Sequence, residues 1–373
     1  MTEYNVTTIP QLASAFNGTI TVDDDYVINI LNDLDFNNDG YYYHESNFFS
    51  RKISSSNCSL TVDGGQYETD PSTGQTVLVK NSVLSNIYMY PRTAFFYINT
   101  DKGGSWSFEA NFKNIDFEVV VNQSSIFGIK EYATLSGYGS QVYMTFENCN
   151  FNIKVANNAS YVLFDGTNFE ARGEKSLTRW KFINCTFNIE YCNSNTDIAV
   201  LTSTHRTAYI NPPTYNGYSD ICSIFESCEF RIKSNVSGLK IRLCADNNVN
   251  KTCATYINNC AFFLNSYYNV SNHSMLQFTY TTNTLSYIYN SFFAAFADTP
   301  DGTIDPDYQF ELHFSFNNSW QARAFCCFYD KQRLKLANDV SLYSGSSLYD
   351  LTTAECKSEA KLKEIGFLFA TET

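Results

Sequence analysis

Apolar and polar positions follow a six-residue pattern that recurs along most of the chain. Each copy reads apolar, polar, Asn, Cys or Ser, polar, Phe, with single departures, and the clearest is Phe146-Glu-Asn-Cys-Asn-Phe151. Seven copies can be counted, with first residues 28 to 43 residues apart. They begin at Leu84, Phe112, Phe146, Phe182, Phe225, Ile257 and Ile288. A pattern that returns at the spacing of one supersecondary unit predicts a repeat architecture.

A second apolar segment follows five of these copies, roughly 14 to 18 residues after each start. These segments are residues 125–129, 161–164, 198–201, 239–243 and 275–278. Each repeat therefore holds at least two short strands. Strands this short cannot bury a face alone, so we expect each coil to stack in parallel on the next, with rungs about 4.8 Å apart. The sequence predicts an all-β solenoid.

The pattern also predicts which side chains stack inside the coils. Period-two alternation places the first apolar residue, the Cys and the last Phe in columns, and leaves the Asn where the chain bends. Asn tolerates left-handed backbone angles, and its amide can bond the same amide one rung away. We expect an asparagine ladder of Asn114, Asn148, Asn184, Asn259 and Asn290, beside a buried thiol column of Cys149, Cys185, Cys228 and Cys260.

An Asn at the bend with stacked Cys, Phe and Ile resembles the right-handed parallel β-helix superfamily of pectate lyases, polygalacturonases and phage tailspikes. The likeness covers roughly residues 60 to 295. Residues 6–15 are similar to the short capping helix found at the start of such proteins. The resemblance implies a fold and says little about chemistry. A compact β-sandwich of many short strands is the alternative, although a sandwich does not need repeats.

The pattern fades after Phe296 into a stretch rich in Pro, Gly and Asp, followed by strand-like segments and a capping box at Thr352. We predict three regions. Residues 1–59 form an N-terminal cap and first strands, residues 60–297 the parallel β-helix, and residues 298–373 a small α+β region for C-terminal capping or oligomerisation.

Composition and charge limit the fold class and the classes of binding partner. Aromatic residues make up 16% of the chain and charged residues only 17%, which favours strands over salt-bridged helices. The net charge of -13 and the lack of any Lys/Arg run argue against nucleic acid. No segment approaches the length of a membrane span, and the N-terminus has no export signal. We expect a soluble chain made in the cytoplasm, with its twelve cysteines reduced.

Two three-residue segments are similar in sequence to motifs of an enzyme. Asn195-Thr-Asp197 and Arg231-Ile-Lys233 are spelled like the first and last of four polygalacturonase motifs, but the Asp-Asp and Gly-His-Gly motifs are missing between them. Inverting hydrolysis needs two carboxylates about 6.5–9.5 Å apart. We therefore interpret the triplets as ordinary chain and predict no catalytic residues. The scattered histidines and the single acidic run Asp23–Asp25 give no metal site or cofactor.

Tyrosines in the loops between copies are the candidates for ligand binding, because their rings stack on sugars and in interfaces. They are Tyr132, Tyr138, Tyr215, Tyr218, Tyr267 and Tyr268.

Three functions remain open on this sequence. The first is a non-catalytic structural or receptor-binding component of a phage virion, similar to a tailspike or fibre: an elongated homotrimer that contacts other virion proteins and a cell-surface polysaccharide. The second is a polysaccharide lyase or glycoside hydrolase of the β-helix type. The third is a bacterial surface adhesin, which an export signal or an anchor would favour.

Overall fold

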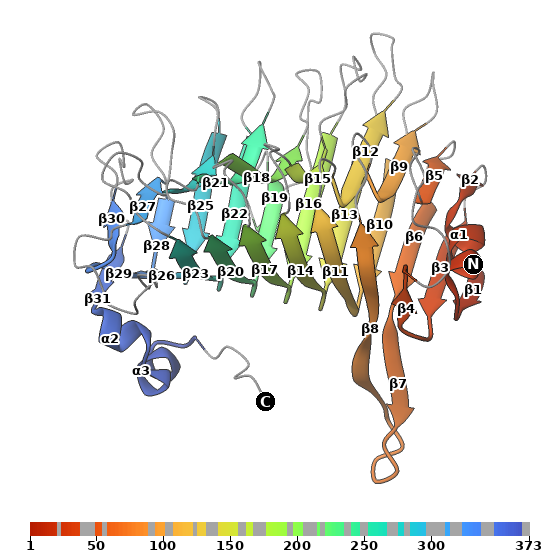
Figure 1. The fold of residues 1–373 in the computed structure, drawn as a ribbon, viewed down its shortest axis with the longest axis horizontal. Helices are drawn as coiled ribbons and strands as arrows, with labels where there is room; N and C mark the ends of the chain where they lie inside the picture. Colours follow the sequence, from red (N-terminus) through yellow and green to blue (C-terminus); the bar gives the residue numbers. More distant parts are fainter. Residues whose placement is uncertain are drawn as a thin grey trace.

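The computed structural model shows three parallel β-sheets wound into a solenoid (Figure 1). The residues that it describes are 1–20, 24–37, 49–53, 58–88, 94–100, 107–121, 125–131, 141–155, 162–166, 177–191, 197–203, 215–216, 221–234, 240–246, 253–266, 275–279, 284–295, 310–313, 323–336 and 347–367.

Each complete coil gives one strand to each sheet in turn, and these strands pair in parallel with their counterparts in the next coil. Sheet A contains β1 (Thr2–Val6), β3 (Asp25–Ile30), β6 (Cys58–Asp63), β10 (Ser107–Lys113), β13 (Gln141–Glu147), β16 (Leu177–Ile183), β19 (Ile221–Glu226), β22 (Cys253–Asn258), β25 (Thr284–Tyr289) and β28 (Arg323–Phe325). Sheet B contains β2 (Gly18–Ile20), β5 (Phe49–Ile53), β9 (Phe96–Thr100), β12 (Phe127–Glu131), β15 (Val162–Asp165), β18 (Asp197–Ser203), β21 (Lys240–Asp246), β24 (Met275–Thr279), β27 (Phe310–His313) and β30 (Leu334–Leu336). Sheet C contains β4 (Leu34–Asp35), β8 (Thr76–Tyr88), β11 (Ile115–Val121), β14 (Asn150–Val155), β17 (Thr186–Tyr191), β20 (Glu229–Ser234), β23 (Ala261–Ser266), β26 (Phe292–Ala295), β29 (Cys327–Asp330) and β31 (Leu348–Leu351), with β7 (Gly65–Thr69) attached to β8. The expected parallel β-helix is confirmed.

The register explains the motif. Its first apolar residue lies in sheet A, where Phe112, Phe146 and Phe182 are direct neighbours, and its last Phe lies in sheet C. In the sheet C column the rings stack face to face with centroids 4.6 to 5.1 Å apart. All of these rings are buried, and each contributes about 1.5–3 kcal/mol of burial free energy.

A single left-handed residue turns the chain from sheet A into sheet C. Its φ is between 45° and 55° at Asn114, Asn148, Asn184, Ser227, Asn259, Asn290 and Cys326. The last of these falls in Ala324-Phe-Cys-Cys-Phe-Tyr329, a further copy of the pattern with Cys at the bend. The three sheets thus continue on both sides of residues 60–297, from β1 to β31.

One coil departs from the expected motif. Leu84 lies opposite Phe117, the last residue of the next copy, whereas the first residue, Phe112, lies opposite Val62. The corner of this coil is therefore at Gly64. Residues 65–81 leave the solenoid there as an antiparallel hairpin of β7 and the first part of β8, visible as the orange projection in Figure 1. We call residues 65–81 the β7–β8 hairpin.

Helices lie at both ends of the solenoid (Figure 1). Helix α1 (Ile9–Phe16) begins at the N-cap Thr8 and buries Ile9, Leu12 and Phe16 against the first coil, as expected for a capping helix. The C-terminal helices α2 (Thr353–Cys356) and α3 (Glu359–Glu364) follow the expected capping box at Thr352. They lie at the end of the last coil (Figure 1). Cys356 and Phe367 pack on outward residues of sheet C, including Ala261, Phe292 and Ala294.

Cysteine oxidation differs in part from the expectation. Eight described cysteines are free, seven of them buried: Cys58, Cys149, Cys185, Cys228, Cys260, Cys327 and Cys356. Cys222, however, is disulfide-bonded. The register of β19 shifts between Ile221 and Ser223, so Cys222 also lies outside the regular thiol column, and the expectation of reduced cysteines, which rested on the cytoplasmic origin expected for the chain, does not hold for this residue.

Candidate functional site

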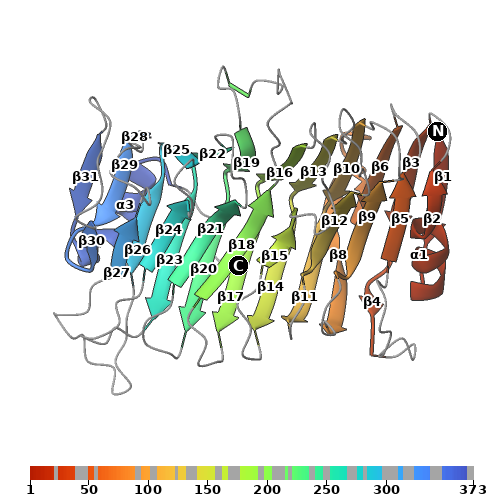
Figure 2. The same ribbon diagram turned by 90° about the horizontal axis from the view of Figure 1, so that it is seen from above.

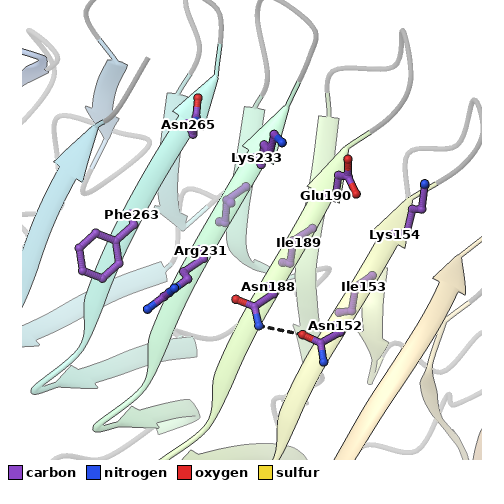
Figure 3. Close-up of a pocket in the computed structure, with 11 residues that line it drawn as sticks. Asn152, Ile153, Lys154, Asn188, Ile189, Glu190, Arg231, Lys233, Phe263 and Asn265 are labelled. Atoms are coloured by element: carbon purple, nitrogen blue, oxygen red, sulfur yellow. Dashed lines mark hydrogen bonds between the residues drawn. The ribbon is translucent and has the colours of Figure 1, made fainter. Parts of the chain in front are cut away.

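The candidate site is a groove on the outer face of sheet C, crossing β14, β17, β20 and β23 (Figure 3). Its volume is about 620 Å³. The β7–β8 hairpin and helices α2 and α3 extend from the same side of the solenoid, one toward each end (Figure 1). The lining is Asn152, Ile153, Lys154, Asn188, Ile189, Glu190, Arg231, Ile232, Lys233, Phe263 and Asn265.

Strand alternation decides which side chains reach this groove. In β14, Phe151, Ile153 and Val155 are buried, while Asn152 and Lys154 are exposed between them. The neighbouring strands keep the same phase, because the register aligns the four strands residue by residue. Two outward-facing columns result. The first is Asn152, Asn188, Arg231 and Phe263, and the second is Lys154, Glu190, Lys233 and Asn265.

The first column presents amides at one end and a cation on an aromatic ring at the other. The Asn188 amide donates to Asn152 Oδ1 at 2.8 Å, which leaves other donor and acceptor positions of both amides to solvent or ligand. Arg231 is ion-paired with Glu229 of its own strand. Its guanidinium carbon lies 6.0 Å from the centroid of Phe263, within the range of a cation–π contact.

The second column alternates in charge. Lys154, Glu190 and Lys233 occupy matching positions in successive strands, so the two lysines are two rungs apart, about 9.6 Å. With Arg231 the lining holds three cations and one carboxylate, although the whole chain carries a net charge of -13. Because Glu229 neutralises Arg231, the two lysines and Glu190 leave the groove with one net positive charge on an acidic protein, which favours anionic or strongly hydrogen-bonding ligands.

The asparagines at the bend form hydrogen-bonded runs outside this groove. Asn184 donates to Asn148 Oδ1 at 2.7 Å, and Asn148 donates to Asn114 Oδ1 at 3.2 Å. Asn114 in turn donates to the carboxylate of Asp63 at 2.9 Å. The run stops at Ser227, whose hydroxyl accepts from Asn259 at 3.1 Å. Asn290 donates to Asn258 rather than to Asn259.

The thiols of Cys149, Cys185, Cys228 and Cys260 stack one residue after the bend. Each is within 3.5 Å of two backbone carbonyl oxygens, one in its own coil and one in the preceding coil. Burial raises the pKa of the Cys149 thiol, and it raises that of Cys327, in the same column, to about 12. Burial therefore disfavours the reactive thiolate at Cys149 and Cys327, which act as packing groups in the core.

Of the six candidate tyrosines, only Tyr215 is among the described residues; Tyr132, Tyr138, Tyr218, Tyr267 and Tyr268 lie outside them. Tyr215 packs on the outer face of sheet A, with its ring centroid 5.4 Å from that of Tyr256. Lys181 Nζ lies 5.1 Å from the same ring. Burial, together with a hydrogen bond to Glu226, raises the pKa of its hydroxyl. Tyr215 is thus half-buried in a separate aromatic cluster and does not contribute to the groove.

The groove residues were missed because their pattern is that of an ordinary strand. Lys154, Glu190 and Lys233 occupy one repeat position, and only the register shows that they converge. The enzyme-like triplets are also separated: Arg231 and Lys233 lie in β20 of sheet C, while Asp197 begins β18 of sheet B. Residues 195 and 196 lie outside the described part of the chain.

No family model, curated protein or solved structure matches this chain. None of the helices in the described part of the chain is long and apolar enough to cross a membrane. Within the same residues, no group of three or more His, Cys, Asp or Glu side chains is placed to hold a metal ion. The fold and the groove therefore carry the functional argument.

Proposed function

We propose that this protein is a non-catalytic structural or receptor-binding component of a virus particle, in which the β-helix is a stiff shaft and the sheet C groove binds a surface polysaccharide. The observation that carries the proposal is the lining of the groove. It combines amides, an arginine against an aromatic ring and two lysines with a single carboxylate, Glu190. Amides and cations suit the hydroxyl and acid groups of a glycan, and an aromatic edge suits its apolar faces.

The scaffold supports binding rather than turnover. Among the described residues that line the groove, Glu190 is the one carboxylate, and the nearby Glu229 is ion-paired with Arg231, whereas glycoside hydrolysis by the common mechanisms uses a pair of carboxyl groups. Side chains fixed on adjacent strands of a continuous sheet form a rigid surface, which lowers the entropic cost of binding. The homotrimer expected from the sequence and the contacts with other virion proteins belong to this same proposal.

Retention and cleavage of a polysaccharide can be measured in one sample. The full chain is incubated with an acidic and a neutral bacterial polysaccharide, and both the bound protein and newly formed reducing ends are quantified. We expect retention on the acidic polymer, weakened at least tenfold by Lys154→Ala with Lys233→Ala, and no new reducing ends. Lys113→Ala, which removes a half-exposed cation from the outer face of sheet A, is the matched control. Release of reducing ends that disappears in Glu190→Gln would favour the hydrolase or lyase instead.

The location of the protein separates the virion from the adhesin. Immunogold labelling of producing cells and of purified particles should place the protein on particles. Labelling of the cell surface alone would contradict the virion assignment and support the adhesin, while leaving the glycan-binding result unaffected.

A further inference from the structure

We propose that the β7–β8 hairpin is the element through which copies of this chain assemble, the edge of β7 in one copy pairing with the edge of β8 in the next. The inference rests on the self-association included in the proposed function and names the surface that carries it. Two-stranded hairpins are marginally stable in water by themselves. This one nevertheless projects from the solenoid (Figure 1).

The base of the hairpin is held firmly. Ser82 donates its N–H to the carbonyl of Gly64 at 2.7 Å, which closes the neck. The Tyr67 hydroxyl donates to Asp63 at 3.0 Å and accepts from Asn114 at 3.0 Å. On the other strand, Asn81 donates to Asp116 at 2.8 Å and to the carbonyl of Asn148 at 3.0 Å. The hairpin therefore joins the end of the asparagine run at a fixed position.

Beyond this base the hairpin exposes apolar side chains. Val77, Leu78 and Val79 are 42%, 40% and 54% exposed, and Tyr67 is 49% exposed. Tyr67 lies directly opposite Leu78 in the ladder, so the two share one face, while Val77 lies opposite Glu68 on the other face. Three consecutive exposed apolar residues on a projecting strand indicate a surface that is covered in the functional protein.

The backbone of the hairpin is open on both sides. Within the residues that the structure describes, Gly65–Thr69 pair only with β8, and residues 76–80 pair only with β7. Unpaired edges are templates for strand addition. A sheet formed between copies would continue the existing antiparallel ladder, and closing that sheet into a ring would turn the Tyr67–Leu78 face inward, away from solvent.

Charge selects the partner edge. β7 carries Glu68, whereas residues 76–81 of β8 carry no carboxylate and their one cation, Lys80, is ion-paired with Asp33 of the same chain. Pairing β7 with β7 of another copy would bring two glutamates together, and pairing β7 with β8 avoids this repulsion. Such a contact joins two different surfaces of the chain, so it is heterologous and must close into a ring or extend into a filament. A ring of three matches the expected homotrimer.

Light scattering coupled to size-exclusion chromatography tests the assignment. We expect the wild-type chain to have the mass of three chains and Leu78→Lys to have the mass of one. Tyr349→Lys is the matched control, because it places the same charge at a similarly exposed apolar position, 48% exposed, in β31 at the other end of the solenoid, and it should retain the trimer. An unchanged trimer in Leu78→Lys would overturn the role of the hairpin while leaving the homotrimer standing. A single-chain mass for the wild type at 100-fold differing concentrations would overturn both.

A deletion variant gives a second test that does not depend on correct folding of Leu78→Lys. Removing residues 65–81 joins Gly64 to Ser82, which reproduces the one-residue corner of the other coils. This variant should keep the wild-type far-ultraviolet spectrum and its retention on polysaccharide, and should elute as one chain. A trimer that survives the deletion would overturn the proposal, and lost glycan retention with an intact trimer would count against the groove instead.

Discussion

At the residue scale, the bend position combines two demands that few side chains meet. Asn184 has a φ of 51° and donates to Asn148 at 2.7 Å. Left-handed backbone costs a residue with a Cβ about 1–2 kcal/mol, and an internal hydrogen bond contributes about 1 kcal/mol. We expect Asn184→Ala to destabilise the protein by about 2 kcal/mol and Asn184→Gly by about 1 kcal/mol, because glycine removes only the bond. Urea unfolding followed by tryptophan fluorescence measures both, and equal losses would show that backbone strain is not the reason for Asn here.

Some of the bend residues could be predicted from the sequence. Asn114, Asn148 and Asn184 were recognisable because a left-handed bend and a run of hydrogen-bonded amides both favour Asn. Ser227 and Cys326 take the same backbone conformation with side chains that the pattern does not specify. The repeat already places Lys154 and Lys233 at one strand position, but it does not show that they line a groove, because that depends on lateral neighbours 36 to 43 residues away and on the outer face of four adjacent strands.

At the element scale, α2 is tied to the last coil through a buried carboxyl group. Asp330 is fully buried and accepts hydrogen bonds from the hydroxyl of Thr353 and the N–H of Gln332, both at 3.1 Å. Burial raises the pKa of Asp330 above its ordinary value of 3.8. The folded protein therefore holds this proton more tightly than the unfolded chain, and the associated stability is present below that ordinary value and is lost as the pH rises through the raised one.

Asp330→Asn should remove this pH-dependent loss. We expect the melting temperature of the variant, relative to the wild type, to increase as the pH rises from 3.5 to 7. Asp350→Asn is the matched control, because hydrogen bonds from Lys331 and Tyr329 lower the pKa of this exposed carboxyl group and its pH dependence has the opposite sign. Parallel melting curves of the Asp330 variant and the wild type at all pH values would contradict the interpretation.

The β7–β8 hairpin shows why some elements escape prediction. Leu60-Thr-Val-Asp-Gly-Gly65 has the composition of a strand followed by a turn, and Leu84-Ser-Asn86 has the letters of the motif. Asn86 is even left-handed, with a φ of 57°, but it sits at a register shift inside β8. The true corner is at Gly64, where a Cβ would lie 2.7 Å from the carbonyl oxygen of Asn114. Only the packing of the next coil reveals this constraint.

At the scale of the whole molecule, the solenoid behaves as a one-dimensional stack in which each coil contacts its neighbours (Figure 2). Deleting residues 148–183 removes one complete coil, that is β14, β15 and β16, and joins Glu147 to Asn184. Phe146 then faces Phe225, and Phe117 faces Phe187, so every aromatic column is restored. Stability in such a stack is a sum of coil and interface terms, so we expect a cooperatively folded protein whose melting temperature is lower by only a few degrees.

Deleting residues 148–165 instead removes β14 from sheet C and β15 from sheet B but leaves β16. Two sheet A strands, β13 and β16, then follow each other along the chain without the sheet C and sheet B strands that complete a coil. That variant should fail to melt cooperatively. If both deletions melt alike, the columns do not act as the repeating unit of stability.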